Sequence, residues 1–248
     1  MRAVVIIPSR YGSSRFNGKP LAGICGQPMI QWVYQRASQA ACVDAVYVAT
    51  DDPRIAAAVE HFDGKVVMTA PDCRSGSDRV AEAAERLGLS MQDVVINIQG
   101  DQPLVDPRCF DALVQPFQDD PSVKMSTLAF AIVDQREISD PKDVKVAMDL
   151  NGDALYFSRA AIPHGRDGLK GYDIYKHLGV YAYTREFLAC FSMLPPGRLE
   201  GIEKLEQLRA MEHGHRIRVV VTPHDSPEVD VPEDIGRIQK KMIAMGIC

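Results

Sequence analysis

The sequence predicts an α/β protein in which a central sheet lies between two layers of helices. In the first half of the 248-residue chain, short runs rich in valine and isoleucine alternate with helical patterns. Strands that are apolar at nearly every position are typical of a parallel sheet covered on both faces. Repeated β–α–β units of this kind wind into a right-handed sandwich of three layers.

The first half supplies these alternating units. The strands expected there are residues 3–7, 44–49, 65–69 and 93–98, and the expected helices are about 27–41, 53–62 and 77–87. Met29, Val33 and Ala37 would share one helical face, which would pack on the sheet. Asp52 and Pro53 suit the N-cap and the first position of the second helix.

The second half has a different rhythm, in which strands follow one another directly. The strands expected there are residues 124–131, 143–149, 153–158, 177–184 and 216–222, and the expected helices are about 199–213 and 233–245. An irregular stretch containing glycine fills residues 159–176. Because no repeat, linker or low-complexity tract interrupts the chain, we expect one domain over residues 1–248, with halves of about 1–120 and 121–248.

Composition excludes several classes of function. The net charge of −5 argues against a broad basic surface for nucleic acid. No apolar run approaches the roughly 18 residues that a membrane span needs, and Pro8 interrupts the opening apolar run, so we expect neither membrane insertion nor a signal peptide. The six cysteines are scattered without a CxxC pair, which favours free thiols in a reducing cytoplasm.

A basic loop follows the first expected strand. Residues 6–21 read IIPSRYGSSRFNGKPL and contain Arg10, Arg15 and Lys19, but neither a GxGxxG nor a GK[ST] pattern. Arginine, lysine and loop amides can match the roughly four negative charges of a nucleoside triphosphate. A solvated turn without a ligand explains the loop alone equally well.

Two acidic residues stand where a metal ion would be useful. Asp101 ends the apolar run VVINIQGDQP, and Asp230 lies in EVDVPEDIG before a helix. Ligands of open α/β sheets bind beyond the carboxyl ends of the strands, and Mg²⁺ favours carboxylates together with phosphate oxygens. The alternatives are that Asp101 caps a turn and that Asp230 caps the helix.

Other polar groups suit a nucleotide or a sugar. In CRSGSDRVAEA, Ser77 suits a helix cap, Gly76 a close approach to a flat ligand, and Arg79 the first helical turn. The alternative is simply a well-capped helix. In the second half, Arg159 beside His177 could hold a carboxylate. Glu203 and Gln207, four residues apart on one helix face, suit sugar hydroxyls, although such a face is usually only solvated.

Taken together, these motifs resemble the 3-deoxy-manno-octulosonate (Kdo) cytidylyltransferases, also called CMP-Kdo synthetases. The resemblance covers about residues 4–240 and rests on IIPSRYGSSRFNGKPL, VATDD, RSGSDRVAEA, INIQGDQP, LYFSRAAIP, HLGVYAY, LEQLR and VDVPEDI. It implies a Rossmann-like fold of the nucleotide-diphosphosugar transferase type, with a mixed central sheet and a smaller β-containing insertion, and a homodimer. It also implies that CTP and Kdo give CMP-Kdo and pyrophosphate with Mg²⁺, in the cytoplasm of Gram-negative bacteria, for lipopolysaccharide synthesis.

The resemblance assigns roles residue by residue. Catalysis falls to Lys19, Asp101 and Asp230, of which the two acids bind the metal. The nucleotide contacts are Pro8, Ser9, Arg10, Tyr11, Arg15, Lys19, Ser77 and Arg79. The sugar-acid contacts are Gln99, Arg159, His177, Tyr181, Glu203 and Gln207. The anomeric hydroxyl attacks the α-phosphorus in line with the departing pyrophosphate, so no side chain is covalently modified.

Four departures from the family pattern qualify this assignment. Where the family pattern has Leu-Pro, this chain has Phe16-Asn17. Where the family has Thr-Glu-Arg, this chain has Ser77-Asp78-Arg79, and where the family has WDRD, this chain has HGRD at 164–167. It also has Gln102 for a glutamate beside Asp101, which weakens metal binding if that acid supports the metal. An amino-substituted Kdo or another acid sugar such as sialic acid therefore stays an alternative substrate. A non-catalytic nucleotide-binding protein on the same fold is the alternative of another class.

Overall fold

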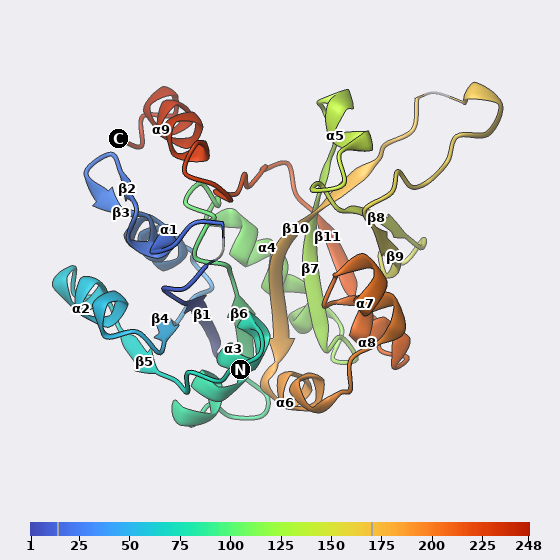
Figure 1. The fold of residues 1–248 in the computed structure, drawn as a ribbon. Helices are drawn as coiled ribbons and strands as arrows, with labels where there is room; N and C mark the ends of the chain where they lie inside the picture. Colours follow the sequence, from blue (N-terminus) through green and yellow to red (C-terminus); the bar gives the residue numbers. More distant parts are fainter. Residues whose placement is uncertain (14, 170) are drawn as a thin grey trace.

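The computed structural model describes residues 1–13, 15–169 and 171–248 (Figure 1). Within these ranges, nine strands form one mixed sheet in the order β11–β7–β10–β6–β1–β4–β5, with β8 beside β10 and β9 beside β8. The strands of the whole described chain are β1 (Ala3–Ser9), β2 (Gly23–Ile24), β3 (Gln27–Pro28), β4 (Ala45–Thr50), β5 (Val66–Met68), β6 (Val94–Asn97), β7 (Met125–Ala131), β8 (Lys145–Met148), β9 (Ala154–Ser158), β10 (Tyr175–Thr184) and β11 (Arg218–Val221).

Helices cover both faces of this sheet. They are α1 (Met29–Ser38), α2 (Pro53–His61), α3 (Gly76–Arg86), α4 (Arg108–Asp119), α5 (Gln135–Ser139), α6 (Arg185–Met193), α7 (Arg198–Glu203), α8 (Leu208–Glu212) and α9 (Asp234–Ala244). Short 3₁₀ turns occur at Lys19–Leu21 and Arg166–Gly168. None of the helices in the described part of the chain has the length and hydropathy that a membrane crossing requires.

The predicted strands are confirmed to within a few residues, and their pairing explains the mixed sheet. β6, β1, β4 and β5 run parallel to one another. β10 then pairs antiparallel with β6 on one side and with β7 on the other, so the sheet continues from the first half of the chain into the second. β11 closes this edge by pairing parallel with β7.

Alternate residues of β1 show why the sheet needs helices on both sides. Val5 and Ile7 pack in one core cluster with α1, α2 and α4. Val4 and Ile6 pack in a second cluster with α3, α6 and α8. All four side chains are fully buried, and each contributes roughly 1.5–3 kcal/mol by leaving water. The predicted three-layer α/β fold is therefore confirmed.

A third apolar cluster packs α9 against the β2–β3 hairpin. Figure 1 shows α9 beside this hairpin, next to the label C. Trp32 lies in this cluster and donates a hydrogen bond from Nε1 to the carbonyl oxygen of Ile24 at 2.8 Å. Here the structure corrects the expectation of six free thiols, because Cys25 and Cys248 form a disulfide. The two cysteines are 223 positions apart, and only the packing of α9 brings them together.

The structure also corrects three details of the helices. The helix expected over 199–213 is two helices, α7 and α8, because Lys204 takes a left-handed conformation with φ of 54°. Ser75, not Ser77, caps α3, accepting a hydrogen bond from the amide of Asp78. Helices α4, α5 and α6 were not expected, although the N-cap pair of Asp52 and Pro53 on α2 is confirmed.

Candidate active site

The candidate site lies beyond the carboxyl ends of β1 and β6, where open α/β sheets bind their ligands. β1 ends at Ser9 and leads into the basic loop, and β6 is followed after a short turn by Asp101. A Cβ atom on Gly100 would come within 3.0 Å of Ser9 Oγ and 3.4 Å of Ile30 Cδ1. Only glycine fits this gap without displacing its neighbours, so the turn that carries Asp101 packs directly on the start of the loop.

Lys19 joins three distant segments at this point. Its ammonium group forms an ion pair with Asp101 Oδ2 and donates to the carbonyl oxygen of Val229 at 3.1 Å. The amide of Val229 in turn donates to the carbonyl oxygen of Asp101 at 3.0 Å. The side chains of Lys19 and Asp101 are each 17% exposed, so solvent screens this pair only partly.

Asp230 follows Val229 and therefore lies at the same place. Its Oδ1 is 3.2 Å from Nη1 of Arg15, which the basic loop supplies. Its amide donates to Asp234 Oδ2 at 2.9 Å, at the start of α9. Asp230 is thus not the cap of α9, and the structure brings together Lys19, Arg15, Asp101 and Asp230 as the sequence predicted.

Glu228 joins this group, although the sequence argument assigned it no role. Gln102 donates from Nε2 to Glu228 Oε1 at 2.9 Å. The pKa of Glu228 is raised to about 7, mainly because surrounding protein desolvates the carboxyl and also because the Asp101 and Asp230 carboxylates lie nearby. The side chain still reaches solvent, so a ligand can touch it. The only sequence signal for Glu228 was its position in EVDVPEDIG. That position alone does not distinguish it from an ordinary surface acid.

The rest of the basic loop is more open. Arg10 is exposed, and Tyr11 lies under the guanidinium of Arg54, whose Cζ is 3.3 Å from the ring centroid. Pro8, near the end of β1, is buried, and a Cβ atom on Gly76, the first residue of α3, would lie 3.5 Å from it. The end of β1 therefore packs against the start of α3, and contact of the main chain of residues 8–11 with a nucleotide stays a prediction.

Ser77 and Arg79 both point inward from α3, but to different partners. The Arg79 guanidinium is 3.0 Å from Asp51 Oδ1 and also donates to Thr69, at the ends of β4 and β5. The Ser77 hydroxyl donates to Glu206 Oε2 at 2.6 Å. Arg79 is thus held in the nucleotide half, whereas Ser77 bonds to a residue of the second half that the sequence argument did not select.

A chain of hydrogen bonds connects the two halves at this position. Gln99 donates to Asn97 Oδ1 at 3.3 Å, and Asn97 donates to Ser77 Oγ at 3.5 Å. Beyond Glu206, the side chain of Gln207 is buried, and its Nε2 has no hydrogen-bond partner in the described residues. A buried amide nitrogen without a partner is costly, which suits a group that a ligand acceptor would satisfy.

His177 and Tyr181 lie on β10, with His177 stacked edge-on against Phe157 at 5.0 Å between ring centroids. Thr127 Oγ1 is 2.8 Å from His177 Nε2 and donates to the carbonyl oxygen of Val180 at 2.8 Å. We infer that the threonine hydrogen goes to the carbonyl, so that Nε2 carries the histidine hydrogen and Nδ1 is an acceptor. Burial lowers the pKa of His177 to about 3, so the ring is neutral near pH 7.

Arg159 and Glu203 are brought together, but largely satisfy each other. Glu203 accepts from Ser158 Oγ at 2.7 Å and from the Arg159 amide at 3.0 Å. The Arg159 guanidinium donates to the carbonyl oxygens of Glu203, Pro141 and Lys204. These contacts connect α7 to the end of β9. They also occupy the guanidinium of Arg159, so the binding of a substrate carboxylate by Arg159 stays a prediction that no free pair of donors supports.

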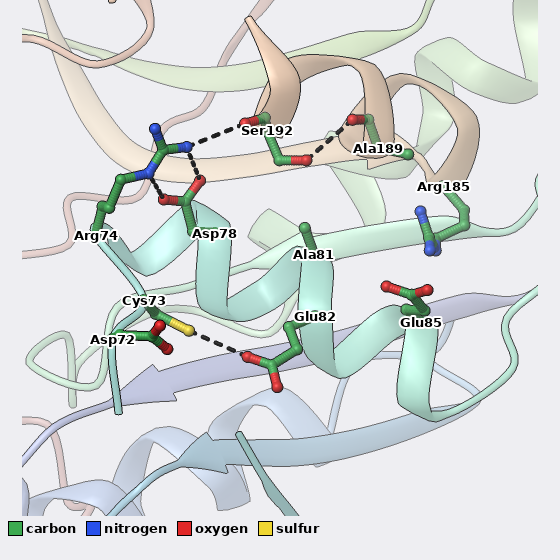
Figure 2. A pocket seen from close by; sticks show the side chains of 10 residues that line it. All are labelled: Asp72, Cys73, Arg74, Asp78, Ala81, Glu82, Glu85, Arg185, Ala189 and Ser192. Atoms are coloured by element: carbon green, nitrogen blue, oxygen red, sulfur yellow. Dashed lines mark hydrogen bonds and ion pairs between the residues drawn. The ribbon is translucent and has the colours of Figure 1, made fainter. Parts of the chain in front are cut away.

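A separate pocket of about 460 Å³ lies between α3 and α6 (Figure 2). Arg74 pairs with Asp78 at the start of α3 and donates to the carbonyl oxygen of Ser192 on α6 at 3.2 Å, and the Cys73 thiol donates to Glu82 at 3.2 Å. None of the predicted site residues is among its lining residues. This pocket is therefore not part of the candidate active site.

Comparison with known proteins identifies the kind of chemistry that this arrangement serves. A family model described as Cytidylyltransferase matches residues 4–217. A 3-deoxy-manno-octulosonate cytidylyltransferase of Desulfatibacillum aliphaticivorans is 63% identical over 96% of this chain and 98% of its own. An 8-amino-3,8-dideoxy-manno-octulosonate cytidylyltransferase of Shewanella frigidimarina is 56% identical over 98% of this chain and 99% of its own.

A solved structure of the same kind of enzyme has the same fold. It is described as CMP:2-keto-3-deoxy-manno-octonic acid synthetase complexed with CTP, and it superimposes with a TM-score of 0.93 at 44% identity. The match covers 99% of this chain and 100% of that chain. The likeness thus extends through both halves of the sheet.

Proposed function

Because the chain belongs to the cytidylyltransferase family, we propose that it transfers CMP from CTP to the anomeric hydroxyl of a 3-deoxy-manno-octulosonate, with release of pyrophosphate. The observation that carries the proposal is the junction of Lys19, Asp101 and the 228–230 segment beside the basic loop. It supports the proposal because cations, which would bind a triphosphate, and carboxylates, which would bind a metal ion, lie at one edge of the sheet.

The triphosphate would bind along the basic loop. Lys19 already faces the acidic group, while Arg10 and Arg15 are exposed beside it and can turn to phosphate oxygens. In phosphoryl transfer, charge spreads over the non-bridging oxygens, and fixed cations stabilise that charge. Lys19, anchored by two contacts, is the cation that would lose least entropy on binding.

Asp101 and Asp230 would hold Mg²⁺, and one observation fits Asp101 for this role. Asp101 Oδ1 is buried and has no hydrogen-bond partner in the described residues, although its other oxygen is paired with Lys19. A carboxylate oxygen left without a donor is the type of ligand that Mg²⁺ prefers. When bound, Mg²⁺ neutralises phosphate charge and favours loss of the hydroxyl proton.

The acid sugar would lie along β10 and toward α8. His177 Nδ1 is available to accept from a sugar hydroxyl, and Gln207 Nε2 to donate to one. Gln99 and Ser77 connect this side to the nucleotide side through Asn97. These residues would orient the anomeric hydroxyl toward the α-phosphorus. Such positioning is the main contribution that protein side chains make to an in-line displacement.

The proposal extends to the setting of the reaction. We infer a homodimer that acts in the cytoplasm and supplies activated sugar for lipopolysaccharide. What supports the dimer is that large apolar side chains of the second half of the chain are exposed, among them Val133 at 78% and Leu155 at 61%. Cytidine triphosphate is a cytoplasmic nucleotide, which supports the compartment.

The proposal is tested by pyrophosphate release with Mg²⁺, each nucleoside triphosphate in turn, and a panel of Kdo, its 8-amino analogue and sialic acid. We expect pyrophosphate release only when the nucleotide is CTP and the sugar is an octulosonate. Asp101→Asn should abolish turnover while the fold stays intact, whereas Asp119→Asn, on an exposed turn of α4, serves as the matched control. Turnover with sialic acid alone, or full activity of Asp101→Asn, would overturn the proposal.

A further inference from the structure

Glu228 is the acid of the active-site group that lacks a cation. Asp101 pairs with Lys19, and Asp230 pairs with Arg15. Among the residues that the structure describes, no lysine, arginine or histidine comes within 4.0 Å of Glu228 to form such a pair. Because CTP and an acid sugar are both anions, an unpaired carboxylate beside them needs a specific reason.

The position of this carboxylate is built by its neighbours. Gln102 is fully buried, and its Oε1 accepts from Ser226 Oγ at 3.4 Å. That contact orients the amide so that Nε2 donates to Glu228 Oε1 at 2.9 Å. A glutamate at position 102 could not donate in this way when ionised, so Gln102 and Glu228 act as a pair.

The Glu228 carboxylate faces β10, the strand that carries His177 and Tyr181, which are proposed to bind the sugar. A Cβ atom on Gly179 of β10 would lie 3.5 Å from Glu228 Oε1 and 3.7 Å from Gln102 Nε2. Because residue 179 is a glycine, it contributes no side chain between β10 and the carboxylate. His177 and Tyr181 flank Gly179 at alternate positions of the same strand, and all three are partly exposed where the residues between them are buried.

We propose that Glu228 binds a primary ammonium group of the sugar, so that the preferred acceptor is an amino-substituted 3-deoxy-octulosonate. This inference rests on the proposed function. An ammonium gives Glu228 a charge-assisted hydrogen bond and the missing cation, whereas a hydroxyl gives only an ordinary hydrogen bond and leaves the charge unpaired. The difference in binding free energy would act at the sugar and not at CTP.

The test compares kcat/KM for 8-amino-3,8-dideoxy-manno-octulosonate with kcat/KM for Kdo, at saturating CTP and Mg²⁺. We expect the unmodified protein to prefer the amino sugar by about 10-fold or more, and Glu228→Gln to reduce the ratio by about 10- to 100-fold. Glu228→Asp keeps the charge and should keep part of the preference. Glu233→Gln, an exposed acid on the same segment, should leave the ratio unchanged.

Three results would overturn the inference. One is a preference for Kdo in the unmodified protein, and another is an unchanged ratio in Glu228→Gln. The third is an equal loss with both sugars together with weaker Mn²⁺ binding by electron paramagnetic resonance, which would make Glu228 a metal ligand. Failure of the proposed function looks different, because neither sugar would then release pyrophosphate from CTP in any variant. Circular dichroism and CTP binding establish that each variant is folded.

Discussion

Replacing Lys19 by methionine removes the ammonium group but keeps most of the apolar stem. The change deletes an ion pair with Asp101 and a hydrogen bond to Val229. A hydrogen bond to a charged group is worth roughly 1.5–3 kcal/mol, and the partner carboxylate is left unpaired beside two other acids. We expect unfolding to become easier by about 2–3 kcal/mol, which is about 4–12 °C in Tm for a chain of this size.

The coupling between Lys19 and Asp101 is the sharper quantity. If Asp101→Asn is made as well, the acid that Lys19→Met leaves unpaired is gone, so the double variant should cost less than the sum of the single variants. We expect a coupling free energy of about 1–2 kcal/mol, measured by urea unfolding of the four proteins. Additive costs, within about 0.5 kcal/mol, would refute the pairing. By calorimetry, Lys19→Met should also weaken CTP binding by about 10- to 100-fold, because it removes a phosphate contact.

Acid should destabilise the protein partly through His177. Its pKa in the folded state is about 3, whereas its ordinary value is 6.5, so between these values only the unfolded chain takes up a proton. The free energy of unfolding therefore decreases by up to about 1.4 kcal/mol for each unit by which the pH is lowered in this range. His177→Gln should flatten this slope in urea unfolding from pH 7 to pH 4, and an equally steep slope would exclude His177 as its cause. Denatured protein without reductant should present four thiols to Ellman's reagent and six after reduction, since Cys25 and Cys248 are paired; six thiols before reduction would show no disulfide. Arg159→Ala should lower Tm by several degrees, because three carbonyl oxygens lose a donor; a raised KM for the sugar with an unchanged Tm would instead restore the carboxylate-binding role.

Local pattern predicted the sheet well because its strands are apolar almost throughout. β1 and β6 carry valine and isoleucine on both faces, and this signal does not depend on distant residues. The rule that ligands bind beyond the carboxyl ends of the strands pointed to the loop of Lys19 and to Asp101, whereas Asp230 was assigned to the site through the family resemblance. In the structure Lys19 contacts Asp101 and the carbonyl oxygen of Val229, the residue before Asp230.

The remaining features depend on contacts that no local pattern contains. The Cys25–Cys248 disulfide follows from the docking of α9, and the break between α7 and α8 from one left-handed residue, Lys204. Glu228 looks like any surface acid until Gln102 and Gly179 are seen beside it. Arg159 carries the charge that a carboxylate site needs, but its partners are main-chain carbonyls, which sequence does not reveal.

We propose that Asp101 and Asp230 hold the metal ion that the triphosphate shares. Mn²⁺ binding, measured by electron paramagnetic resonance with and without CTP, tests it most directly. We expect the unmodified protein to bind Mn²⁺ tightly in the presence of CTP, and Asp101→Asn and Asp230→Asn each to weaken that binding by at least 10-fold, with Glu233→Gln unaffected. Equal Mn²⁺ affinity in all four proteins would contradict the claim.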